Sequence, residues 1–126
     1  MLERLPSEYW ETNCAVTASF MHRDDCALRQ AIGVERIMWG SDYPHLEGTA
    51  PFSREAIRRT FAGVPQEEAE AMLGTNAARI YGFDLTALQP LADRVGPTVA
   101  EVHAGLDVVP QGAMSLAFQD YAPLNV

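Results

Sequence analysis

A strand, a helix and a second strand follow one another between residues 13 and 39, and this order restricts the fold more than any other feature. Side chains alternate in type along Asn13–Phe20, which is typical of a β-strand. Both faces of that segment are small or apolar, so we expect cover on two sides, as in a parallel sheet. Arg36–Trp39 predicts the second strand, and Cys26–Ile32 predicts the helix between them. Such βαβ units cross over with a right hand.

Helix signals lie on both sides of the second predicted strand. Asp24 or Asp25 is expected to cap the helix that precedes it. Ser53 is expected to cap a later helix, and Gly74 to end the one after that. The sequence therefore predicts helices that alternate with strands and then a purely helical stretch.

The chain beyond residue 83 is less regular. Asp84 is expected to cap a helix over Leu85–Val95 that contains Pro90. From Gly96 onward, Gly and Pro interrupt short apolar pieces, so residues 84–126 are expected to form a helix and a tail that packs on the body without a strong element of its own. We treat residues 1–126 as a single partial domain.

Composition excludes several classes of partner. The 126-residue chain has a net charge of −8 and a pI of about 4.7, whereas nucleic acid and anionic membranes attract basic surfaces. It has no run of about 20 apolar residues, the length that spans a bilayer. Met1–Asn13 lacks the apolar block of a secretory signal. Cys14 and Cys26 form no C-x-x-C pattern, so we expect reduced thiols and a cytoplasmic protein.

The segment Ile37–His45 carries the candidate site. A buried strand ends at Gly40, and an acid, an aromatic residue and a histidine follow it. Open and closed α/β folds place their chemistry at this carboxyl end of the strands. Asp42 is therefore a candidate metal ligand or catalytic proton acceptor, while His45 and Tyr43 are candidates for binding a small-molecule substrate. His22 follows the first strand and is a third candidate for substrate binding, because parallel strands end at the same edge.

Each candidate also has an ordinary structural interpretation. Asp42 suits a turn, because Asp accepts hydrogen bonds from its own backbone. His45 is compatible with a surface loop, and His22 with the polar entry to a helix. Tyr43 belongs to a residue class that is more often packed in a core. Glu47, later in the same loop, is expected to be solvated.

Three motifs carry a resemblance to a known family. Trp39–His45 reads WGSDYPH, Gly74–Gly82 reads GTNAARIYG, and Leu5–Trp10 reads LPSEYW. Over residues 5–83 the chain resembles the amidohydrolase-related family (amidohydrolase 2), in its branch of metal-dependent hydrolases and decarboxylases.

The resemblance implies a fold and a chemistry. The family's fold is a (β/α)8 TIM-type barrel, in which Asn13–Phe20 would be the seventh strand and Arg36–Trp39 the eighth. Asp42 matches the acid that binds the divalent ion, zinc or manganese, or serves as a base near it. The implied reaction is hydrolysis or non-oxidative decarboxylation (a lyase reaction) of a small carboxylic or cyclic substrate. Asn76–Arg79 matches the helix that closes the barrel.

The chain also departs from the family pattern. A barrel of this type takes about 250 residues and eight strands, and the His-x-His motif of the family is absent from these 126 residues. We therefore expect the last part of a metal-dependent enzyme, incomplete as a barrel, that associates with itself or with a complementary N-terminal half. Alone, the chain is expected to hold no metal tightly. The alternative is a non-catalytic fragment or interaction module that retains the end of the fold.

Overall fold

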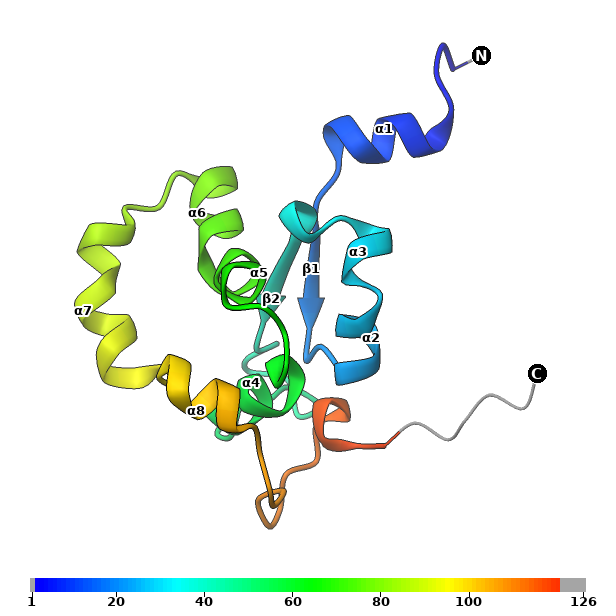
Figure 1. Cartoon of the computed structure of the whole chain (residues 1–126). Coiled ribbons are helices and arrows are strands. Elements are labelled where there is room, and N and C mark those ends of the chain that lie inside the picture. Colours follow the sequence, from blue (N-terminus) through cyan, green and yellow to red (C-terminus); the bar gives the residue numbers. More distant parts are fainter. Residues whose placement is uncertain (1, 121–126) are drawn as a thin grey trace.

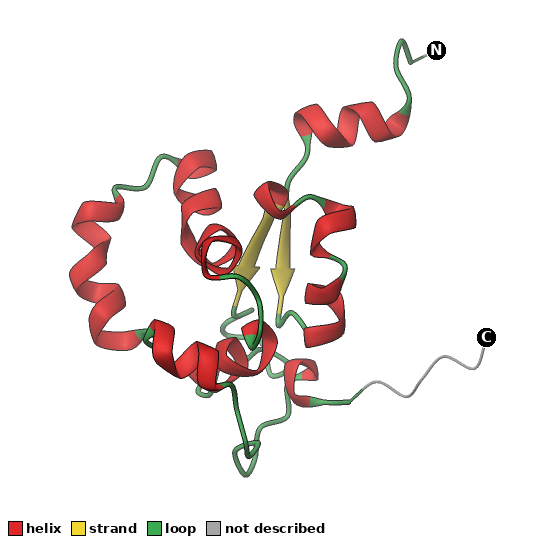
Figure 2. Ribbon diagram, in the orientation of Figure 1, coloured by secondary structure: helices red, strands yellow, loops and turns green. Residues whose placement is uncertain are grey.

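The computed structural model describes residues 2–120, and its elements surround one small sheet (Figures 1 and 2). The strands are β1 (Val16–Ser19) and β2 (Ile37–Gly40). The α-helices are α1 (Pro6–Asn13), α2 (Arg23–Ala27), α3 (Arg29–Ile32), α4 (Ser53–Phe61), α5 (Gln66–Glu70), α6 (Asn76–Tyr81), α7 (Leu85–Val95) and α8 (Val99–Ala104). Three further turns of helix are η1 (Val34–Arg36), η2 (Ala71–Thr75) and η3 (Leu116–Phe118). Within residues 2–120, no helix is both long enough and apolar enough to cross a membrane.

The two strands are parallel neighbours, as the sequence predicts. Val16 pairs with Ile37 and Ser19 pairs with Gly40, so both carboxyl ends lie at the same edge. The crossover between the strands holds α2 and α3, two short helices instead of the single predicted helix over Cys26–Ile32. In Figure 2 these two helices lie on one side of the strand pair, and α5 and α6 lie on the other.

The expectation that both faces of β1 are covered is wrong for this chain. Val16 and Thr17 of β1 are exposed, whereas Ile37 and Met38 of β2 are buried. The physical reason is position: among the described residues, β1 has a neighbouring strand on one side only. Its outer edge and part of its surface therefore face solvent.

Two predicted helix caps are also wrong. His22, rather than Asp24 or Asp25, is the N-cap of α2: its Nδ1 accepts the Asp24 N–H at 3.1 Å, and the Asp25 carboxylate accepts the His22 N–H at 3.2 Å. Ser53 is the first residue of α4, after the cap residue Phe52. In both places the helix begins within three residues of the predicted start, and a residue nearby in the sequence is the N-cap instead.

Gly74 does not end a helix, contrary to prediction. The turn η2 is a π-helix that continues α5 directly into α6, so Gln66–Tyr81 is one helical stretch. Single π-helical turns within α-helices are rare and are frequently found at functional sites. Here Asn76 follows that turn, and its amide Nδ2 donates to the Val34 and Ile37 carbonyls, each at 2.8 Å.

The core has two parts. The larger cluster contains Met21, Cys26, Ile37, Phe61, Val64, Ala69 and Met72. It joins the strands to α2, α4 and α5. Burial raises the pKa of the Cys26 thiol to about 11, so this thiol stays protonated and unreactive near neutral pH. The smaller cluster packs Ala117 and Phe118 of η3 against Ala56 of α4.

Ala117 and Phe118 pack the described part of the tail on the body, and this part also contains a helix that the sequence analysis did not expect. Helix α8 begins with a capping box, in which Thr98 Oγ1 accepts the Glu101 N–H at 3.2 Å and Glu101 accepts the Thr98 N–H at 2.7 Å. The hydrogen bonds from Thr98, with Arg54 nearby, hold the pKa of Glu101 below its usual range. Arg54 of α4 bonds both Glu101 carboxylate oxygens at 2.9 Å. The end of the predicted tail, residues 121–126, lies outside the described residues.

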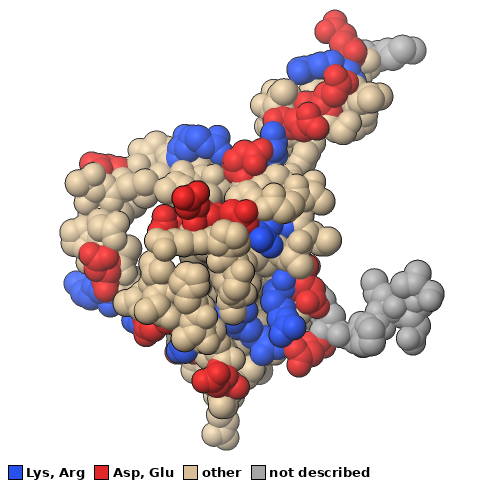
Figure 3. Space-filling model, in the orientation of Figure 1, with Lys and Arg blue, Asp and Glu red and all other residues tan. Residues whose placement is uncertain are grey.

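Helix α7, whose cap Asp84 is confirmed, spans an arch between α6 and α8 (Figure 1). All of its residues are exposed, and the space-filling view shows an opening between the arch and the body (Figure 3). Leu85, Leu88, Leu91 and Val95 recur at helical spacing and share one side of α7. An apolar side of this kind is normally stabilised by packing on another surface.

Substitutions at Asn76 test how much its hydrogen bonds contribute to the stability of this fold. Asn76→Ala should lower the free energy of unfolding by about 1–3 kcal/mol, because the Val34 and Ile37 carbonyls lose their donor. Asn76→Asp keeps the shape but sets a carboxylate oxygen against both carbonyl oxygens, so it should cost more than alanine. Urea unfolding followed by circular dichroism measures both.

The control for this test is Asn13→Asp at the exposed end of α1. It should change the free energy of unfolding by less than about 0.5 kcal/mol. An Asn76→Asp variant as stable as the unmodified chain would contradict the bridging role of Asn76.

Candidate functional site

The candidate site is a closed loop that follows β2. Ser41 O accepts the Thr49 N–H at 2.8 Å, which brings the two ends of the loop together. Inside the loop, the Gly48 N–H donates to His45 O at 3.1 Å. Thr49 Oγ1 lies 2.9 Å from Ser53 Oγ at the start of α4, so the loop is fastened to that helix. The polar residues of the loop are therefore held at the carboxyl edge of the strands.

Asp42 stands at the point where the chain turns away from β2. Its backbone is left-handed, with φ of 59°, a conformation that Asp and Asn adopt more readily than most residues. The Asp42 side chain is 20% exposed. His45 contacts it twice: the His45 N–H donates to Asp42 O at 2.9 Å, and Nδ1–H donates to Asp42 Oδ2 at 3.1 Å. Asp42 thus orients the imidazole ring of His45.

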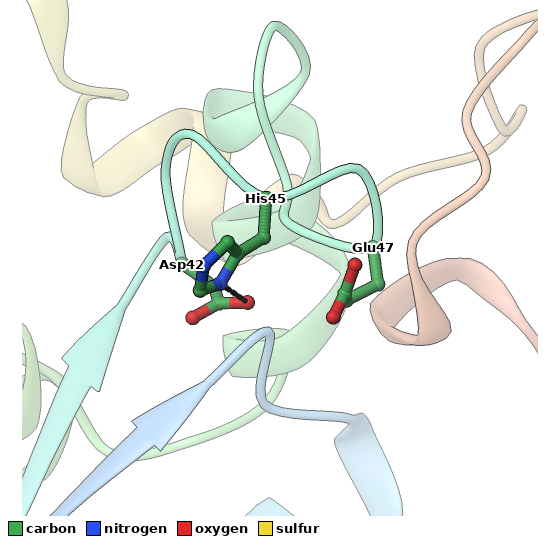
Figure 4. A group of neighbouring side chains, drawn as sticks. All are labelled: Asp42, His45 and Glu47. Carbon is green, nitrogen blue, oxygen red and sulfur yellow. Dashed lines mark hydrogen bonds and ion pairs between the residues drawn. The ribbon is translucent and has the colours of Figure 1, made fainter.

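Glu47 completes a group of three side chains that could hold a cation (Figure 4). One ligand atom each from Asp42, His45 and Glu47 lie within 4.8 Å of one another. Glu47 is solvated as expected, but sequence reasoning missed that it lies beside Asp42. The available signal was an acid, a histidine and an acid within six consecutive positions of one loop, Asp42 to Glu47.

The donor set fits a divalent cation such as zinc or manganese. Catalytic zinc sites use carboxylate oxygen and imidazole nitrogen, with three protein ligands and one open position. Metal–ligand bonds of about 2 Å bring donors closer than 4.8 Å, so the exposed Glu47 side chain would turn toward Asp42 and His45. Without a cation, the Asp42–His45 pair can still act as an oriented acid–base group, because the carboxylate fixes the ring and its tautomer.

His22 lies at the same edge but is not presented to solvent. Its side chain is buried, at 1% exposure, and bonds protein groups through both ring nitrogens. Nδ1 accepts the Asp24 N–H, and Nε2–H donates to Gln119 O. His22 therefore ties the end of β1 to the C-terminal segment. Substrate binding by His22 stays a prediction that no contact in the structure tests.

Tyr43 and Trp39 take different places. Trp39, on β2, packs against the main core. Tyr43 is largely exposed and, with His45, lines a groove beside the loop. Tyr43 and His45 are thus placed where a ligand in the groove would contact them, and their roles in substrate binding stay predictions.

A family model described as Amidohydrolase matches residues 1–83. The chain belongs to the amidohydrolase family. The match spans both strands, the Asp42 loop and the helical stretch through α6. The amidohydrolase family has a TIM-barrel fold and is usually metal-dependent. Over residues 2–120, this amidohydrolase-family chain has a mixed helix and strand structure with one two-stranded sheet. The searches of curated proteins and of solved structures found no match to the chain.

A substitution at Gly48 tests whether close packing holds the residues of this loop in place in this amidohydrolase-family chain. A Cβ added at Gly48 would lie 2.7 Å from Ser41 O and 2.9 Å from Asp42 O, both backbone atoms. Gly48→Ala should therefore displace the loop and lower the free energy of unfolding by about 1–3 kcal/mol. Amide chemical shifts over residues 41–49 should move, as measured by NMR.

The matched control is Gly74→Ala, because a Cβ at Gly74 meets nothing within 4 Å. This variant should leave the shifts of residues 41–49 unchanged and should not lower stability, since Ala favours a helix more than Gly does. Equal effects of the two substitutions would show that the contacts at Gly48 do not position the site.

Proposed function

We propose that the chain is the C-terminal part of a metal-dependent amidohydrolase barrel. In this assignment β1 and β2 are the seventh and eighth strands. The reaction is hydrolysis or non-oxidative decarboxylation of a small carboxylic or cyclic substrate. The observation that carries the proposal is the place of Asp42, at the carboxyl end of a parallel strand pair and hydrogen-bonded to His45.

The family and the geometry support the same position for the chemistry. The family match covers the Asp42 loop. Barrel enzymes carry their catalytic residues on the loops at the carboxyl ends of the strands. Asp42 lies on such a loop, and its neighbours His45 and Glu47 offer the kinds of donor atoms that divalent metals bind.

The chain's own residues have defined parts in this proposal. Asp42 would hold the cation or take up a proton, and it already orients the imidazole of His45. His45 and Glu47 would hold the cation or bind the substrate at the exposed side of the loop. When bound, a divalent cation polarises a carbonyl or carboxylate group and lowers the pKa of a water molecule.

The proposal also assigns a partner to the strand edges. Each strand has one neighbour within the described residues, and unpaired edges readily pair with another strand. In the proposed enzyme the remaining strands of the barrel cover these edges, and they come from a longer polypeptide or a complementary half.

The second candidate is an interaction module without catalysis. The exposed apolar side of α7, which lies beyond the family match, favours it. The two candidates differ at Asp42, which only the enzyme needs.

Calorimetric titration of the chain with zinc and manganese tests the metal assignment. Weak binding is expected, because the site is exposed and its third donor must turn inward. Asp42→Asn keeps the shape and removes the charge, so it should weaken binding at least about tenfold. Glu67→Gln, on the exposed acidic side of α5, is the control and should leave the affinity unchanged.

The outcomes separate the candidates. Equal metal affinity in Asp42→Asn and the unmodified chain would remove Asp42 from the site. Submicromolar zinc binding would show a complete site, which the proposal does not predict. In a longer polypeptide that supplies the other strands, Asp42→Asn should abolish turnover while leaving the fold intact, and His45→Ala should mainly raise KM.

A further inference from the structure

A groove lies between the Asp42 loop and the segment around η3. Its volume is about 360 Å³, which is within the usual range for small-molecule sites. One wall comes from residues 43–52 and the other from residues 112–118. The second wall lies beyond the family match, which ends at Phe83. The groove therefore combines a loop inside the family match with a segment that the family match does not include.

The second wall is firmly attached to the body. Ala117 and Phe118 are buried against Ala56 of α4. The Ser115 hydroxyl accepts the Ala117 N–H at 3.4 Å, which stabilises the turn η3. One residue beyond η3, Gln119 O accepts a hydrogen bond from the buried His22. These contacts hold the wall in place without a ligand.

The lining of the groove is mainly apolar and aromatic. Phe52 and Phe118 contribute rings, Met114 a thioether, and Pro44 and Pro51 rigid apolar surfaces. Met114 is 69% exposed, so its contacts with the protein are few and its side chain is available to a ligand. Methionine sulfur and aromatic side chains contact aromatic rings favourably.

One residue, His45, belongs to both the groove and the candidate site. His45 lines the groove and is hydrogen-bonded to Asp42. A ligand lying in the groove would therefore contact His45, whose hydrogen bond leads to Asp42.

We propose that the groove binds an aromatic ring of the substrate, with Met114 as a specificity-determining contact. This inference rests on the proposed function, since the carbonyl or carboxylate attached to the ring would lie at the Asp42 loop. The substrate class is then an aromatic acid or amide. The segment around η3 selects the ring, and the family's loop holds the reacting group.

The test uses benzamide and acetamide, two neutral amides that differ in the ring. In metal-free chain, benzamide should shift the Met114 methyl signal in NMR saturably, while acetamide at equal concentration should not. Met114→Ala should weaken benzamide binding by about threefold to tenfold, measured on the Phe118 ring signals. Leu88→Ala, an equally simple truncation of an exposed residue on α7, should leave benzamide affinity unchanged.

A second titration separates this inference from the proposed function. Benzoate should bind more tightly when zinc is present, because zinc offsets the charges of Asp42 and Glu47. If zinc has no effect but benzamide still binds at Met114, the groove assignment stands and the metal assignment fails. If benzamide shifts Met114 no more than acetamide does, or if Met114→Ala binds as well as the unmodified chain, the groove assignment is overturned.

Discussion

The parallel pairing of β1 with β2 decides where the candidate site residues of this chain lie. Because Ser19 is in register with Gly40, the segments that leave the two strands emerge at one edge. Antiparallel pairing would have separated His22 from Asp42 by the length of the sheet. Residues with a left-handed backbone, Phe20 and Asp42, follow the two strands, so the chain turns sharply at this edge after each strand. The position of the candidate site is thus determined by strand direction, not by side-chain chemistry.

Buried polar side chains then fasten the helices to this pair. The Asn76 amide joins the helical stretch of residues 66–81 to the backbone around β2. His22 joins the end of β1 to the segment that follows η3, and Thr60 Oγ1 donates to Met21 O at 2.7 Å. Each bond satisfies a group that would be costly to bury alone. Together they hold the Asp42 loop and the groove wall in fixed positions, although the two are far apart in sequence.

Sequence reasoning recovered the features that depend on short-range pattern. Alternation and apolar runs gave both strands and their direction, and the place of Asp42 after β2 followed from them. It failed where tertiary contacts override local preference: Gly74 lies within a continuous helix because the adjoining stretch packs on β2, and His22 replaces Asp24 as a cap because its ring is buried. The capping-box residues Thr98 and Glu101 indicate helix α8, but the sequence analysis does not predict that helix. The proximity of Glu47 to Asp42 depends on how the loop closes, which no periodic pattern records.

We propose that this edge of the strand pair is the metal-binding end of an amidohydrolase-family fold. Paramagnetic broadening by manganese, followed on the amide signals of the full chain, tests this assignment. Substoichiometric Mn²⁺ should broaden the amide signals of Asp42, His45 and Glu47 first, while Glu67 and Glu70 on the acidic side of α5 should keep their signals until much higher concentrations. Broadening that begins on α5, or that spreads evenly over all exposed acids, would contradict it.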